Sequence, residues 1–131
     1  MDLEVGQKAQ REMTVTKEMV QSYAEITGDY NPLHFDEEFT SNTRFDGLIC
    51  QGGITTGLLH AMVAMDMPGP GTVFLSQNWS FPKPVYIGDT IMAEATVTSA
   101  SNRRSIAKLD ISIKNQSGDE VLKGEATVFQ A

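Results

Sequence analysis

The chain has 131 residues, of which 40% are hydrophobic and 21% are charged, and its formal net charge is -7 at pH 7. This length and composition indicate one globular domain and exclude a disordered or fibrous protein. The acidic charge argues against a nucleic-acid partner, because sequence-independent binding to phosphate needs a basic surface, but it leaves room for a small anionic ligand held by a local patch.

The first elements in chain order are a weak strand and a capped helix. Residues 6–16 ("GQKAQREMTVT") alternate only weakly and predict a short edge strand. Residues 17–27 predict a helix, because Thr16 can cap its start and Gly28 can take the left-handed conformation after its end. The apolar positions of this helix recur at helical spacing: Met19, Tyr23 and Ile26. A turn signal at Asn31-Pro32 follows, and residues 33–42 predict a short helix or an irregular turn.

A longer helix is predicted over residues 52–65. It begins with two glycines, runs apolar and stops before the segment "PGPG" at residues 68–71. Gly53, Gly57 and Ala61 fall every fourth residue and give one face almost no side-chain bulk, so that a sheet or helix can approach the backbone closely. We therefore expect this helix to be central and wrapped by other elements.

The second half of the chain predicts four long strands. Apolar and polar residues alternate in each, which is typical of half-buried antiparallel strands. The expected strands cover residues 72–81, 89–100, 105–114 and 120–130, and "NQSGDE" between the last two is a hairpin signal. In the first strand the expected face is Val73, Leu75, Gln77, Trp79 and Phe81. The alternating apolar positions of the next two strands are Ile91, Ala93, Ala95 and Val97, and then Ala107, Leu109, Ile111 and Ile113. The sequence thus predicts one α+β domain over residues 1–131, in which an antiparallel sheet curves around the central helix.

Other signals narrow the chemistry and the location. The single cysteine, Cys50, cannot form a disulfide within the chain, and no cluster of cysteine and histidine has zinc-ligand spacing, so we expect chemistry without metal or cofactor. Residues 1–10 show no basic leader with an apolar run, which favours a cytoplasmic location. No apolar run approaches the roughly 18 residues of a membrane-spanning helix, so no membrane association is expected.

Residues 27–36 ("TGDYNPLHFD") gather the residue types that acid-base chemistry needs. Asp29 and His34 lie five residues apart across an Asn-Pro turn and can converge on one water, the carboxylate taking its proton while the imidazole orients it. Each also has an ordinary structural interpretation: Asp29 as a turn aspartate that bonds nearby N–H groups, and His34 as a packed or surface residue. Asp36 forms an H-x-D pattern with His34, but no third metal ligand accompanies it.

The start of the central helix offers a second half of a site. The first turn of a helix has N–H groups without intrahelical partners, so an oxyanion can be held at Gly52 or Gly53. The structural alternative is that these glycines only permit tight packing. His60 lies two turns further on, facing either the core or a pocket, and the sequence leaves both open.

Three segments together are similar to a known family. "GDYNPLHFD" at 28–36, "FDGLICQGG" at 45–53 and "SFPKPVYIGDTI" at 80–91 resemble the MaoC-like (R)-specific enoyl-CoA hydratases and hydroxyacyl-thioester dehydratases over nearly the whole chain. The resemblance implies a hot-dog fold, in which an antiparallel sheet wraps one long helix. It also implies a homodimer or a higher homo-oligomer, with acyl-thioester sites at or near the subunit interface.

The resemblance also implies roles for individual residues. Asp29 and His34 match the catalytic pair, and Asn31 matches the asparagine that supports the turn. The implied reaction is reversible syn addition of water to a trans-2-enoyl-CoA, giving an (R)-3-hydroxyacyl-CoA, with the thioester oxygen stabilised at Gly52 or Gly53. The carrier can be coenzyme A or an acyl carrier protein.

Two departures from the family pattern concern the expected substrate pocket. This chain has Gln51 where many members have histidine, and His60 where short-chain hydratases often have serine. Both bear on substrate identity rather than on reaction type. Lys83, with Arg103 and Arg104, is a candidate contact for phosphates, although a solvated hairpin is the commoner meaning of such residues. The competing functions are a hot-dog thioesterase and a non-catalytic thioester-binding module.

Overall fold

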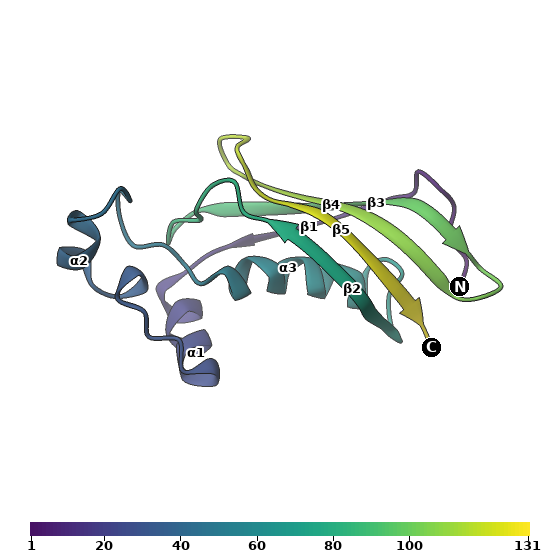
Figure 1. The fold of residues 1–131 in the computed structure, drawn as a ribbon, viewed down its shortest axis with the longest axis horizontal. Coiled ribbons are helices and arrows are strands. Elements are labelled where there is room, and N and C mark those ends of the chain that lie inside the picture. Colours follow the sequence, from purple (N-terminus) through teal and green to yellow (C-terminus); the bar gives the residue numbers. More distant parts are fainter.

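An antiparallel sheet lies over one long helix, and the remaining helices extend beyond one end of the sheet (Figure 1). The computed structural model describes all residues, 1–131. Its five strands are ordered β1-β3-β4-β5-β2 across the sheet. The strands are β1 (Lys8–Thr14), β2 (Thr72–Ser80), β3 (Thr90–Ser101), β4 (Ile106–Asn115) and β5 (Glu120–Gln130). The helices are α1 (Lys17–Thr27), the 3-10 turn η1 (Pro32–His34), α2 (Glu37–Ser41) and α3 (Gly52–Met65).

The predicted helices are confirmed together with their caps. Thr16 accepts a hydrogen bond from the Met19 N–H at 3.2 Å, and Gly28 ends α1 in the left-handed conformation with φ +83°. α3 covers the predicted residues 52–65. The segment 33–42, predicted as a short helix or turn, contains the end of η1 and all of α2. None of the helices combines the length and apolar character that crossing a bilayer requires.

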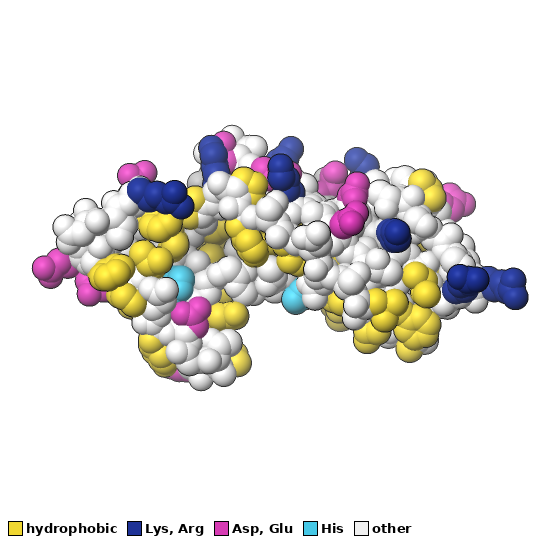
Figure 2. All heavy atoms as spheres, viewed as in Figure 1, with side chains coloured by type: hydrophobic (Ala, Val, Ile, Leu, Met, Phe, Trp, Pro, Cys, Tyr) yellow, Lys and Arg dark blue, Asp and Glu magenta, His cyan; other side chains and the backbone are white.

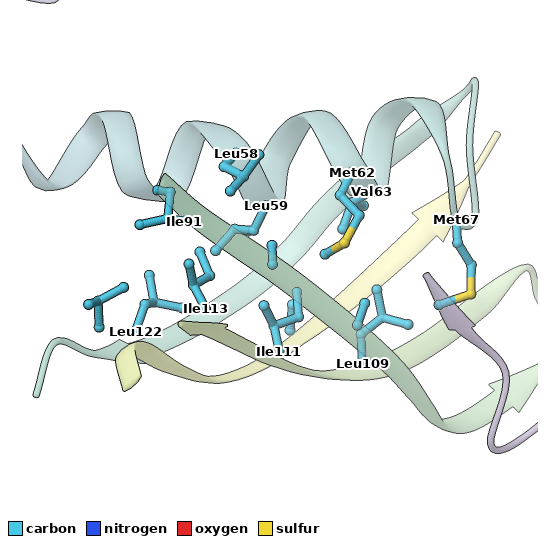
Figure 3. Close-up of a cluster of buried hydrophobic side chains, with 14 of the residues drawn as sticks. Leu58, Leu59, Met62, Val63, Met67, Ile91, Leu109, Ile111, Ile113 and Leu122 are labelled. Atoms are coloured by element: carbon cyan, nitrogen blue, oxygen red, sulfur yellow. The ribbon is translucent and has the colours of Figure 1, made fainter. Parts of the chain in front are cut away.

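The core lies between α3 and the sheet. Leu59, Met62 and Val63 of α3 point toward side chains of β3, β4 and β5 (Figure 3). The predicted inward faces of two strands are confirmed as buried: Ile91, Ala93, Ala95 and Val97 on β3, and Ala107, Leu109, Ile111 and Ile113 on β4. Burial of this apolar surface is the main force that holds the helix to the sheet.

The expectation that a sheet or helix approaches the small face of α3 closely is met by helix α1 at one glycine. The sheet packs on the bulkier positions, since these bury more apolar surface. A Cβ at Gly57 would have no atom of another element within 4 Å, whereas one at Gly53 would overlap the Tyr23 hydroxyl of α1. Along this face a hollow of about 550 Å³ runs between α3, α1 and β1. Close approach therefore occurs at one glycine only.

Two other predicted faces are confirmed only in part, since Met19 and Tyr23 of α1 and Trp79 of β2 pack against the core but their predicted neighbours do not. Ile26 is 83% exposed, and α1 buries Val20 and Ala24 instead. In β2 the register shifts between Phe74 and Ser76, which is a β-bulge that interrupts the alternation. Phe74 therefore packs on the core, while Val73 and Leu75 are 52% and 56% exposed. Figure 2 shows hydrophobic side chains gathered where β2 begins and the chain ends.

Candidate active site

A hydrogen-bonded turn after α1 presents Asp29. The Asp29 N–H donates to Thr27 Oγ1 at 3.2 Å, and the Asn31 N–H donates to Asp29 Oδ1 at 3.3 Å. Asn31 Oδ1 in turn accepts from the Leu33 N–H at 3.1 Å and caps η1. Asn31 thus supports the turn through its own main chain and side chain. The Asp29 side chain is 41% exposed, so a solvent water can reach its carboxylate.

His34 ends η1 with its imidazole almost fully buried. Nδ1 lies 2.7 Å from the main-chain oxygen of Ile49. Because a carbonyl oxygen only accepts, Nδ1 carries the proton, and Nε2 of the neutral ring is then an acceptor. Nε2 lies 3.6 Å from Asp29 Oδ1. The fold thus brings together the two residues predicted to form the catalytic pair.

The spacing of this pair suits a shared water better than a direct bond. A separation of 3.6 Å is too long for a hydrogen bond between the two groups. The carboxylate and the unprotonated Nε2 are both acceptors, and a water has two protons to donate to them. The imidazole also borders a hollow of about 500 Å³ lined by Val20, Phe35, Leu48 and Ile87 among others. The arrangement can hold a water and take its proton.

The start of α3 is the second predicted part of the site. The N–H groups of Gly52 and Gly53 have no intrahelical acceptor because they belong to the first turn. Gly52 faces a hollow of about 270 Å³ that Cys50, Phe81 and Lys83 also line. Burial raises the pKa of the Cys50 thiol to about 11, so this thiol stays protonated at neutral pH and is not an activated nucleophile.

The side chain of Gln51 is buried inside the protein and does not line an open pocket. It is 1% exposed, and its Nε2 donates to the main-chain oxygens of Val20 at 3.1 Å and Asp29 at 3.4 Å. Its Oε1 is buried and has no hydrogen-bond partner. A substrate contact by Gln51 stays a prediction, and the contacts that the structure shows are all to the main chain.

His60 turns toward β2. Its Nε2 lies 2.8 Å from Gln77 Oε1, and its ring centre lies 4.9 Å from that of Phe74. No hydrogen bond or ion pair joins it to the Asp29 and His34 pair. A role for His60 in substrate binding therefore stays a prediction.

One other sequence feature has a structural role. Asp36, considered as part of a metal pattern, caps α2 by accepting from the Phe39 N–H at 3.1 Å. No group of three or more histidine, cysteine or acidic residues is placed to hold a metal ion.

The basic residues proposed for phosphate contact do not cluster within the chain. Lys83 follows β2 and pairs with Asp119 at 3.2 Å, at the end of the sheet where β4 leads into β5. Arg103 and Arg104 lie in the β3–β4 turn at the opposite end. β4 has ten residues, so about 30 Å separate the two ends. One phosphate group therefore cannot contact all three side chains of one chain.

The residue that sequence reasoning missed is Ile49. Its main-chain oxygen fixes the His34 tautomer, and its N–H donates to the Leu33 oxygen at 3.2 Å. A main-chain acceptor leaves no mark in the residue types of a sequence. The hydrophobic side chain of Ile49 gave no signal of this role.

Comparisons with known proteins show the family to which the chain belongs. The family model described as "MaoC like domain" matches residues 2–118. The (R)-specific enoyl-CoA hydratase of Aeromonas caviae is 36% identical over 126 residues, covering 96% of this chain and 94% of that protein. The 3-hydroxybutyryl-CoA dehydratase of Methylorubrum extorquens is 40% identical over 128 residues, covering 97% of this chain and 80% of that protein.

A solved structure gives the same result for the fold. The (R)-hydratase from A. caviae involved in PHA biosynthesis superposes with a TM-score of 0.92 at 36% identity. The superposition covers 98% of each chain. The likeness thus extends over the sheet, α3 and the segment that holds Asp29 and His34.

Proposed function

Since the chain belongs to the MaoC-like domain family and has the predicted hot-dog fold, we propose that it catalyses the reversible hydration of a trans-2-enoyl-CoA to an (R)-3-hydroxyacyl-CoA. The two curated relatives named above are a hydratase and a dehydratase, which confirms the predicted reaction class, a hydro-lyase. The observation that carries the proposal is the Asp29 carboxylate 3.6 Å from the His34 imidazole, on a turn open to solvent.

In the hydration direction, the pair activates one water. The water donates one hydrogen bond to His34 Nε2 and one to Asp29, and Asp29 takes its proton as the oxygen bonds to the β-carbon. The electron pair of the carbon–carbon double bond moves toward the thioester carbonyl and gives an enolate. Asp29 then returns the proton to the α-carbon, so that addition occurs on one face and the carboxylate is restored.

Negative charge on the thioester oxygen needs a stabilising partner in the transition state. The N–H groups of Gly52 and Gly53 are suitable because they lie in the first turn of α3, where the helix dipole adds positive potential. One such donor contributes about 3 kcal/mol to transition-state stability in related oxyanion sites. We assign this role to Gly52 or Gly53.

A homodimer is part of the proposal. β2 is an edge strand of the sheet, and its exposed Val73 and Leu75 give it an apolar margin that a second copy can cover. Light scattering coupled to gel filtration distinguishes a dimer from the 14.3 kDa monomer. The cytoplasmic location and the choice between coenzyme A and an acyl carrier protein stay predictions.

The test is crotonyl-CoA consumption by the purified protein, with Asp29→Asn assayed in parallel. We expect loss of the enoyl-thioester absorbance without thiol release, and chiral analysis should give (R)-3-hydroxybutyryl-CoA. Asp29→Asn should lower kcat by orders of magnitude because the amide cannot accept the proton. Thiol release by the wild type identifies a thioesterase instead. A wild type inactive on short, long and carrier-protein-bound enoyl thioesters contradicts the proposed function.

A further inference from the structure

Gln51 connects three parts of the candidate active site through one side-chain amide. It is the residue directly before α3, so its main chain leads into Gly52 and Gly53. Its Nε2 donates both to Val20 O inside α1 and to Asp29 O in the catalytic turn. The amide therefore joins α1, the turn and the start of α3 at a position that is 1% exposed.

The main chain of Asp29 is held from both sides. Its N–H donates to Thr27 Oγ1, which belongs to the same local turn. Gln51 supplies the one hydrogen bond to its carbonyl oxygen and comes from a segment 22 residues away. The link to Gln51 is thus the contact that ties the Asp29 main chain to the helix start.

His34 is tied to the same segment two residues earlier. Ile49 O accepts from its Nδ1 at 2.7 Å. Residues 49–51 therefore anchor both members of the acid-base pair and lead directly into the proposed oxyanion site. Within this segment Gln51 is the only residue that acts through its side chain on the catalytic turn.

The hydrogen bonds of Gln51 do not suggest a residue kept for stability. Both acceptors are carbonyl oxygens, so the NH₂ group must face them. The Oε1 is then buried without a partner, which is unfavourable. An apolar side chain of the same length would avoid this penalty but would release Asp29.

We propose that Gln51 is a positioning residue for the hydration reaction, which fixes the Asp29 main chain relative to the start of α3. This inference rests on the proposed function. Asp29 must take a proton from water at the β-carbon while a Gly52 or Gly53 N–H holds the thioester oxygen of the same substrate. A displacement of about 1 Å between such groups can lower the rate about a hundredfold.

Gln51→Met tests the proposal, because methionine matches glutamine in length and has no N–H donor. We expect kcat for crotonyl-CoA to fall about a hundredfold while KM changes less than about twofold, the pattern of a group that acts only in the transition state. Gln130→Met is the matched control, since Gln130 Nε2 also donates to two main-chain oxygens, those of Pro68 at 3.3 Å and Pro70 at 3.1 Å. The control should keep wild-type kcat.

Gln51→His separates positioning from substrate binding. Imidazole keeps an N–H donor for one of the two carbonyls, so kcat should recover to within about tenfold of the wild-type value at unchanged KM. Wild-type kcat in Gln51→Met, or an equal loss in Gln130→Met, overturns the proposal. A rise of KM at constant kcat in Gln51→His assigns this residue to substrate binding and also overturns it. If Gln51→Met does not fold, the kcat and KM of Gln51→His alone decide between positioning and substrate binding.

The main-chain amide resonances of the Asp29 to Asn31 turn give a readout that does not depend on activity. They should shift in Gln51→Met and stay in place in Gln130→Met. A wild type that hydrates no thioester contradicts the proposed function, whereas unshifted resonances in Gln51→Met contradict the positioning role. The two failures are therefore distinguishable.

Discussion

The sheet with α3 and the turn that holds the proposed catalytic pair are stabilised by different interactions. The core cluster has 23 buried hydrophobic residues, and most of them lie on α3 and on β3, β4 and β5. Between Gly28 and Ile49 the buried residues are His34 and Thr40, and neither is hydrophobic. The turn depends on hydrogen bonds between side chains and the main chain, at Thr27, Asn31 and Gln51.

This difference separates stability from catalysis. Truncation of a core side chain removes apolar contacts that hold the fold and leaves a cavity. A change in the turn removes one or two exposed hydrogen bonds, which affect the free energy of unfolding little but decide where Asp29 and His34 lie. Variants in the core should therefore change mainly the free energy of unfolding, and variants in the turn should change mainly kcat.

The largest effect is expected for His34→Gln. Glutamine can still donate to the Ile49 oxygen, but it has no ring nitrogen to accept from the water near Asp29. We expect kcat to fall by a factor of about 10² to 10⁴, with a thermal midpoint close to wild type. Steady-state kinetics on crotonyl-CoA and a circular dichroism melt measure the two quantities. A variant with more than about a tenth of wild-type kcat would falsify the role of His34 in holding the water.

Leu109→Ala should show the opposite pattern. Leu109 lies on β4 with 0% exposure, and its truncation should lower the free energy of unfolding by about 2–5 kcal/mol. The kcat of the folded fraction at low temperature should stay within about twofold of wild type, because the turn does not depend on this side chain. Urea titration measures the first quantity, and Lys108→Ala is the exposed neighbour on the same strand for comparison. A selective loss of kcat in Leu109→Ala would show that the two regions are coupled.

The sequence predicted best the elements whose side chains follow one regular pattern or whose ends carry a clear capping residue. The alternation in β3 and β4 named their buried faces, and the caps Thr16 and Gly28 gave both ends of α1. The bulge in β2 broke the same reasoning, because nothing in the residue types of Phe74 to Ser76 marks where a register shifts.

At the candidate site, the sequence and its family resemblance named Asp29, Asn31 and His34, which the fold brings together. The interactions that place them were not predictable. Ile49 acts through its main-chain oxygen. The amide of Gln51 donates to the carbonyl oxygens of Val20 and Asp29, which precede it by 31 and 22 positions in the chain. Such contacts depend on tertiary structure and have no periodic signature.

Asn31→Ala should have an intermediate effect both on kcat and on the free energy of unfolding. It removes the cap of η1, and loss of such a cap costs about 1 kcal/mol of stability. We expect kcat to fall by about threefold to tenfold, because His34 ends the turn that Asn31 caps. Asp36→Ala is the matched control, since Asp36 caps α2 in the same way outside the catalytic pair. Equal kcat in the two variants would contradict a specific role for Asn31.

The smallest effect is expected for Gly57→Ala, and the informative result is whether this change raises or lowers the free energy of unfolding. Gly57 lies inside α3, where alanine is favoured over glycine, and an added Cβ would meet no atom of another element within 4 Å. We therefore expect a gain of about 0.5–1 kcal/mol in the free energy of unfolding, measured by urea titration at several protein concentrations. Gly53→Ala is the comparison, because there the Cβ would overlap the Tyr23 hydroxyl and the Tyr23 side chain would have to move. A loss of stability in Gly57→Ala at high protein concentration only would mean that a second copy packs into the hollow between α3, α1 and β1. The part of the small face that α1 leaves open at Gly57 would then be covered by a second copy.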